Sequence, residues 1–101
     1  MWQDDGWKLE IKRFRDMLDE NDEEIVNKLG QRMQLCEKIG EIKSKQGLSI
    51  YVPQREREIL EKRLEWGLKH NLRLKFIRVL FKVIISESKK RQKELIEIKA
   101  C

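Results

Sequence analysis

The fold is decided by residues 7–46, which read WKLEIKRFRDMLDENDEEIVNKLGQRMQLCEKIGEIKSKQ. Apolar residues recur here at steps of three, four or seven, the spacing of one face of an α-helix: Trp7, Ile11, Phe14, Leu18, Ile25, Leu29, Cys36 and Ile39. Gly30 and Gly40 each cost such a helix about 1 kcal/mol relative to alanine. Either is a candidate for a close helix contact, but neither is flanked by other turn residues. The stretch predicts one long amphipathic helix.

Two further helices follow. Gly47 is a suitable stop for the first helix, residues 48–52 read as a short loop, and Pro53 fits the first turn of a second helix. That helix runs to about Gly67 and buries Ile59, Leu60 and Leu64.

Residues 69–71 read as a second connection, and a third helix is expected from about Arg73 to Lys99. Between Phe76 and Ile85 this helix is apolar nearly all round, so we expect it to be central.

Length and composition restrict the fold class. A chain of 101 residues has room for one domain, residues 1–101, of which 1–8 are expected to fray. Apolar residues make up 40% and charged residues 41%, so a core requires narrow apolar faces, as on amphipathic helices. We therefore expect an all-α fold of three helices, whose thin core a partner subunit completes.

Charge and cysteine content leave several partners open. A net charge of +5 suits nucleic acid, an acidic lipid surface or a small anion equally well. Cys36 and Cys101 are too few for a disulfide framework, and His70 has no Cys or carboxylate at ligand spacing, so no metal site is expected. No apolar run reaches the roughly 18 residues of a membrane span, and the N-terminus lacks the pattern of a signal peptide. We expect a cytoplasmic protein without membrane association.

Two cations interrupt the apolar stripe of the first helix. Arg32 and Lys43 are eleven residues apart, which places them within about 20° on one face and about 16 Å apart along the axis. Buried cations need an anion, because unpaired buried charge is costly. The alternative for each is that it reaches solvent or pairs with Glu37 or Glu41.

Arg15 lies seventeen residues before Arg32, or about 25 Å along the same helix. It is too far away to bind the same small ligand from the same helix. If Arg15 belongs to such a site, it must come from another subunit.

The other helices also carry polar residues on inward faces. Ser88 and Gln92 are four residues apart and continue the face of Phe81, Ile84 and Ile85. Glu56 lies one turn before Leu60 on the inward side, although an acidic residue in a first helical turn is also explained by the helix dipole. The run Lys89, Lys90 and Arg91 is expected to be a solvated face near a helix end.

These exceptions share one chemistry. They offer cations for a small dianion, amide and hydroxyl groups for neutral oxygens, and one carboxylate for a hydroxyl. The sequence shows no nucleophile with a paired base. Catalysis at such a site would rest on positioning and electrostatics.

The order Arg15, Arg32, Lys43, Arg55, Glu56, Ser88, Gln92 resembles the all-helical chorismate mutases, including the mutase domain fused to prephenate dehydratase in bacteria. The resemblance covers about residues 10–98. Its most telling stretches are QRMQLCEKIGEIK at 31–43, PQREREIL at 53–60 and LFKVIISESKKRQ at 80–92. The set at these spacings is far more specific than any one stretch.

The resemblance implies a cofactor-free isomerase that rearranges chorismate to prephenate in phenylalanine and tyrosine biosynthesis. It implies an intertwined homodimer in which the long first helices cross. Arg15 from the partner chain and Arg32 would hold the substrate carboxylates, assisted by Ser88. Lys43 and Gln92 would bind the ether oxygen of the breaking bond, and Lys43, Gln92 and Arg32 would be the catalytic residues.

By the same resemblance Glu56 would bind the ring hydroxyl, and Arg55 would tune the local field. Two positions depart from the family pattern, since Val52 stands where some members have an aspartate near the ring hydroxyl and Arg73 replaces an acidic helix-starting residue. Glu56 is left as the only carboxylate expected at the hydroxyl.

Two rival functions remain. An isochorismate pyruvate lyase has the same helices, but Glu56 and Ser88 argue against it, because that relative lacks both. A non-enzymatic helical dimer could bind nucleic acid through the basic run, but that function leaves Arg32, Lys43 and Gln92 unexplained.

Overall fold

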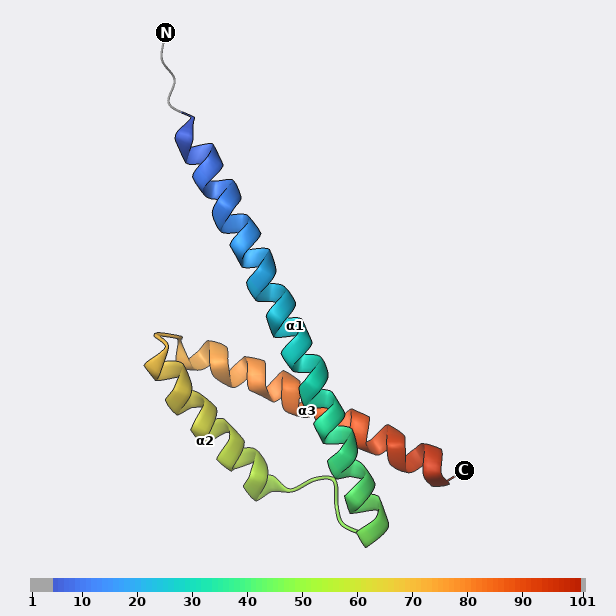
Figure 1. Ribbon diagram of the computed structural model, residues 1–101. Helices are drawn as coiled ribbons and strands as arrows, with labels where there is room; N and C mark the ends of the chain where they lie inside the picture. The colour runs from blue at the N-terminus through green and yellow to red at the C-terminus, as the bar shows by residue number, and fades with distance from the viewer. Residues whose placement is uncertain (1–4, 101) are drawn as a thin grey trace. The chain divides into compact units, whose positions relative to one another are not determined.

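The computed structural model describes residues 5–100, with side chains described through residue 94. This part of the chain forms three helices and no strand (Figure 1): α1 at Gly6–Gln46, α2 at Pro53–Lys69 and α3 at Leu74–Ala100. The all-α prediction with a long first helix is confirmed. Gly6, the first residue of α1, falls within the segment expected to fray, and residues 1–4 of that segment lie outside the description.

The chain divides into two compact units, Met1–Arg32 and Met33–Cys101, so α1 contributes to both. In the first unit, α1 carries an apolar stripe that is exposed along its whole length, including Trp7, Ile11, Phe14, Leu18 and Ile25. A helix is normally stabilised in water by packing its apolar face. This stripe therefore resembles a helix face that packs against another protein surface.

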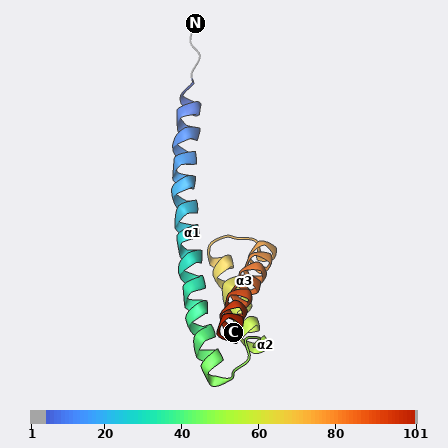
Figure 2. The ribbon, with the colours of Figure 1, turned by 90° about the vertical axis from the view of Figure 1, so that its right-hand side faces the viewer.

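The second unit holds the buried residues. Its core consists of Met33, Cys36, Ile59, Ile77, Ile84 and Ile85. These come from all three helices, and α2 and α3 lie side by side, as Figure 2 also shows. Leu60 and Leu64, expected inside with Ile59, are only half-buried.

The prediction that α3 is central holds for one face only. Ile77, Ile84 and Ile85 are buried, whereas Val79 and Val83 are 55% and 62% exposed. Ile39, expected on the inward stripe of α1, is also 48% exposed. The second unit, like the first, presents apolar side chains that its own core does not cover.

The helix ends follow from local chemistry. Gly47 adopts a positive φ of 64°, and the Leu48 amide donates to the Lys43 carbonyl at 2.8 Å, a glycine-terminated C-cap. At the end of α2, Asn71 takes the left-handed conformation, with φ 58°, and the Leu72 amide donates to the Gly67 carbonyl at 2.9 Å.

Pro53 occupies the first turn of α2, as predicted, and Val52 precedes it without a side-chain cap. At the start of α3, the Arg73 carbonyl accepts from the Ile77 amide at 3.1 Å. Within the described residues, no helix is both long and apolar enough to cross a bilayer.

Candidate functional site

The centre of the candidate site is a contact between Lys43, in the last turn of α1, and Gln92 on α3. The Lys43 ammonium donates to the Gln92 side-chain oxygen at 3.2 Å and to the Ile50 carbonyl at 3.2 Å. Gln92 is only 7% exposed and Lys43 is half-buried. The amide oxygen is thus occupied by Lys43, which leaves the amide nitrogen as the donor end of Gln92.

Gln92 can lie so close to α1 because residue 40 is a glycine. A Cβ at Gly40 would lie 3.0 Å from the Gln92 Cγ and 3.1 Å from its Cα. The expectation that one of the two α1 glycines marks a close contact is correct for Gly40, whereas a Cβ at Gly30 would meet nothing within 4 Å.

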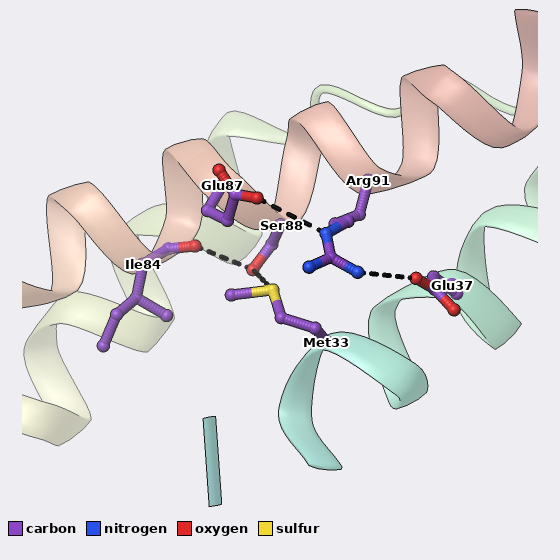
Figure 3. Close-up of polar contacts among 6 residues, drawn as sticks. All are labelled: Met33, Glu37, Ile84, Glu87, Ser88 and Arg91. Carbon is purple, nitrogen blue, oxygen red and sulfur yellow. Dashed lines mark hydrogen bonds and ion pairs between the residues drawn. The ribbon is translucent and has the colours of Figure 1, made fainter. Parts of the chain in front are cut away.

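Ser88 lies one turn before Gln92 and is 6% exposed. Its hydroxyl has two acceptors in reach, the Ile84 carbonyl at 2.8 Å and the Met33 sulfur at 3.9 Å (Figure 3). The shorter bond is the common one between a helical serine and the carbonyl four residues earlier. Donation to a substrate would require the hydroxyl to rotate away from Ile84, which costs one weak hydrogen bond.

Glu56, in the first turn of α2, is paired with Lys89 of α3 at 3.1 Å. The Lys89 ammonium also lies 5.0 Å from the centre of the Tyr51 ring, within the range of a cation–π contact. If Glu56 only complemented the dipole of α2, it would not need an ion-pair partner such as Lys89. One carboxylate oxygen faces Lys89, and the second is available for a hydroxyl donor.

The basic run differs from the expectation of a solvated face. Arg91 donates to Glu37 at 3.0 Å and to Glu87 at 3.3 Å, as Figure 3 shows, and Lys89 is paired as described. The bonds to Glu37 and then Glu87 raise the pKa of Arg91 above its ordinary value. Of the three residues Lys90 is exposed, whereas Lys89 and Arg91 are half-buried and join α3 to α2 and α1.

These pairs also decide between the alternatives for Lys43. Glu37, a possible partner for Lys43 on sequence grounds, is taken by Arg91. Lys43 instead turns toward Gln92 and the loop carbonyl of Ile50. Lys43 is therefore part of a polar cluster with the Gln92 side chain and the Ile50 carbonyl.

Three candidates remain, Arg55, Arg15 and Arg32. Arg55 is exposed and lies 3.8 Å from Glu58 on the surface of α2. Arg15 is exposed and Arg32 is half-buried, and both belong to the first unit. Their place at the site stays a prediction.

Sequence reasoning missed Lys89 and Arg91 as structural residues. The four-residue spacing of Glu87 and Arg91 was a visible signal for one ion pair. The pairs Lys89–Glu56 and Arg91–Glu37 join different helices, so no local spacing could have revealed them.

Comparisons with known proteins identify the family of this chain. The sequence pattern of the family described as chorismate mutase type II matches residues 14–93. A bifunctional chorismate mutase/prephenate dehydratase of Aquifex aeolicus is 55% identical over 53 residues, 52% of this chain and 15% of the relative. One of Buchnera aphidicola (strain APS) is 37% identical over 84 residues, 83% of this chain and 22% of the relative.

The chain thus spans less than a quarter of the length of these two bifunctional relatives. A chorismate mutase of Methanocaldococcus jannaschii is of comparable length, with 28% identity over 87 residues that cover 86% of this chain and 88% of the relative. Since the family match spans residues 14–93, most of the chain, the chain belongs to the chorismate mutase type II family.

Proposed function

We propose that this protein is a chorismate mutase, an isomerase that converts chorismate to prephenate. The observation that carries the proposal is the buried contact between Lys43 and Gln92 inside the segment that matches the family. An ammonium and an amide donor on an otherwise apolar face are suited to an oxygen that gains negative charge in the transition state.

The reaction needs no proton transfer. One carbon–oxygen bond breaks while one carbon–carbon bond forms within the same molecule, so the enzyme must hold the reactive shape and stabilise the developing charge. In the proposed site Lys43 and the Gln92 amide nitrogen face the ether oxygen. Donors fixed in advance help the transition state more than the ground state, where this oxygen carries less charge.

Binding of the substrate carboxylates is assigned to arginines. Arg32, and Arg15 of the partner subunit, would grip the two carboxylates, because a guanidinium holds a carboxylate with two parallel hydrogen bonds. Ser88 would assist after its hydroxyl rotates. Glu56 would accept from the ring hydroxyl with the oxygen that does not face Lys89, and Arg55 would contribute through its charge.

The same proposal includes a homodimer. It is supported by the exposed apolar stripe of α1 and by the length of helix between Arg15 and Arg32, about 25 Å. We also propose a cytoplasmic location, supported by membership in the chorismate mutase family. Binding to nucleic acid is disfavoured because Lys89 and Arg91 are engaged in ion pairs.

The test is to mix the purified protein with chorismate and follow the loss of chorismate and the appearance of prephenate. Isochorismate is the matched control substrate, with release of pyruvate as its readout. Prephenate formation that is strongly reduced but still measurable in Gln92→Ala supports the mutase. Pyruvate release from isochorismate without prephenate formation would favour the lyase, and no turnover of either substrate would refute both.

A further inference from the structure

Gly40 is the residue through which α1 approaches the backbone of α3. It is buried, and a Cβ at this position would lie 3.0 Å from the Gln92 Cγ and 3.1 Å from both the Cα and the Cβ of Gln92. These distances are shorter than ordinary carbon–carbon contacts of about 3.5–4.0 Å. Any side chain at residue 40 would therefore push the backbone of α3 away at Gln92.

The contact coincides with the polar pair of the site. Gly40 lies one helical turn before Lys43, so both face Gln92 from the same side of α1. Gly40 sets the distance between the two backbones, and Lys43 holds the amide oxygen at 3.2 Å. A displacement of a few tenths of an ångström would lengthen that bond beyond ordinary hydrogen-bonding distance.

We propose that Gly40 is a positioning residue for the reaction, because it allows the Gln92 amide to be held against Lys43 with its nitrogen directed at the substrate oxygen. The inference rests on the proposed function and extends it to a residue without a polar side chain. Gly40 acts through Gln92 and touches no substrate.

Gly67 provides the contrast. A Cβ there would lie 2.8 Å from the Ile77 Cγ1, so this glycine too permits close packing, between α2 and α3. Its neighbour is an apolar core side chain, whereas the neighbours of Gly40 are the Cα and the side-chain Cβ and Cγ of a site residue, Gln92. The two glycines therefore allow a positioning role to be separated from a packing role.

The experiment is a double-mutant cycle. Gly40→Ala and Gly67→Ala are each made in the parent protein and in Gln92→Ala, and kcat and KM for chorismate are measured where all proteins are folded. Gly40→Ala is expected to lower kcat about tenfold in the parent, since small misplacements of catalytic groups are costly. In Gln92→Ala it should lower kcat less than about twofold, because the group it displaces is already absent.

Gly67→Ala should change kcat by the same factor in both backgrounds. An equal loss from Gly40→Ala in both backgrounds would overturn the proposal, and so would a Gly40→Ala chain that does not fold. A Gly40→Ala chain that does not fold would show that Gly40 is needed for folding and not specifically for positioning Gln92. Folding is expected because the displacement is small and alanine is a better helix former than glycine.

A second readout does not depend on activity. The side-chain amide signal of Gln92 in an NMR spectrum is identified by its loss in Gln92→Ala, and it should shift in Gly40→Ala but keep its position in Gly67→Ala. A parent protein without mutase activity would refute the proposed function, but the NMR test of whether Gly40 positions Gln92 would still be valid. An unshifted signal in Gly40→Ala would refute the positioning role even if the parent is active.

Discussion

Lys43 illustrates how a charge is kept on an apolar face. Its ammonium has two oxygen acceptors at 3.2 Å, the side chain of Gln92 and the Ile50 carbonyl, and neither carries a formal charge. The positive charge is therefore oriented but not neutralised within this pair. Such a cation keeps its attraction for an anionic substrate, whereas a cation already paired with a carboxylate would have to give up that partner.

Lys43→Ala should lower kcat for chorismate by at least about two orders of magnitude, because it removes a donor aimed at developing negative charge. The helical content should be unchanged, as measured by circular dichroism. Lys45→Ala is the matched control, since Lys45 lies in the same helical turn but is exposed. Near-normal turnover of Lys43→Ala would show that this lysine has no part in the chemistry.

Gln92→Glu should be poor at pH 8 and should gain activity as the pH falls. An ionised carboxylate accepts hydrogen bonds only and repels the ether oxygen, and it would also form an ion pair with Lys43, which lies 3.2 Å from the present amide oxygen. The protonated form can donate as the amide does, so activity appears below the pKa of the introduced carboxyl.

The measurement is the pH profile of kcat at saturating chorismate, so that altered binding is not taken for altered chemistry. The parent enzyme is the control and should show no matching gain on the acid side. If Gln92→Glu equals the parent at pH 8 and its profile is flat below it, Gln92 has no role in the mechanism.

At the scale of the elements, ion pairs join α3 to both α1 and α2. Glu37 of α1 and Glu56 of α2 reach Arg91 and Lys89 of α3 across the helix boundaries. Both pairs are partly exposed, so screening by solvent limits what each contributes to stability. The buried apolar residues and the two close glycine contacts are therefore expected to account for most of the packing stability.

Gly67→Ala should lower the free energy of unfolding by about 1–3 kcal/mol, because the added methyl group overlaps the Ile77 side chain where α2 and α3 meet. Urea unfolding at one fixed chain concentration measures the change. Gly30→Ala is the control, since a Cβ at Gly30 meets nothing within 4 Å of its own chain. It should be neutral or stabilising by up to about 1 kcal/mol. A Gly67→Ala protein as stable as the parent would mean that Ile77 can move without cost.

At the scale of the molecule, the apolar surface left uncovered by one chain is the dominant feature. The first unit buries none of its described residues, and the apolar side chains of Phe14 and Ile25 on its stripe are 52% and 57% exposed. In the second unit Phe76 and Val83 are 55% and 62% exposed. Faces of this kind are normally covered by another protein surface, and a second copy of the chain is the partner that the proposed site requires for Arg15.

Mixing two inactive variants should restore activity if the site is shared between subunits. Arg15→Ala and Arg32→Ala are each expected to be inactive alone. After random subunit exchange half of the dimers are hybrids, and each hybrid has one intact site and one site that lacks both arginines, so about a quarter of all sites should recover.

Sedimentation of the same samples establishes the oligomeric state, and mass spectrometry of differently labelled chains confirms exchange. Mixing Arg32→Ala with Gln92→Ala is the control. Both residues are expected from one chain, so each site of a hybrid lacks one of them and no activity should be recovered. Recovery in this mixture would show that Arg32 and Gln92 of one site come from different chains. A fully active monomer, or no recovery after confirmed exchange of Arg15→Ala with Arg32→Ala, would contradict the shared site.

The sequence by itself determined the helical class, the three helices and the inward position of the polar residues on α3. Those features depend on periodicity and on local turn residues such as Gly47 and Pro53, which act over a few positions of the chain. Ser88 and Gln92 were predicted to face the core from their spacing alone, and both are buried.

Only the tertiary structure decided which side chains meet. The contacts of Gln92 with Lys43 and Gly40, and of Glu56 with Lys89, join residues that lie far apart in sequence, so no periodic pattern specifies them. The approach of two helices depends on the volume of every side chain between them. A glycine that looked like a small cost to one helix is the residue that brings α1 against α3, because a close contact is a property of two surfaces together.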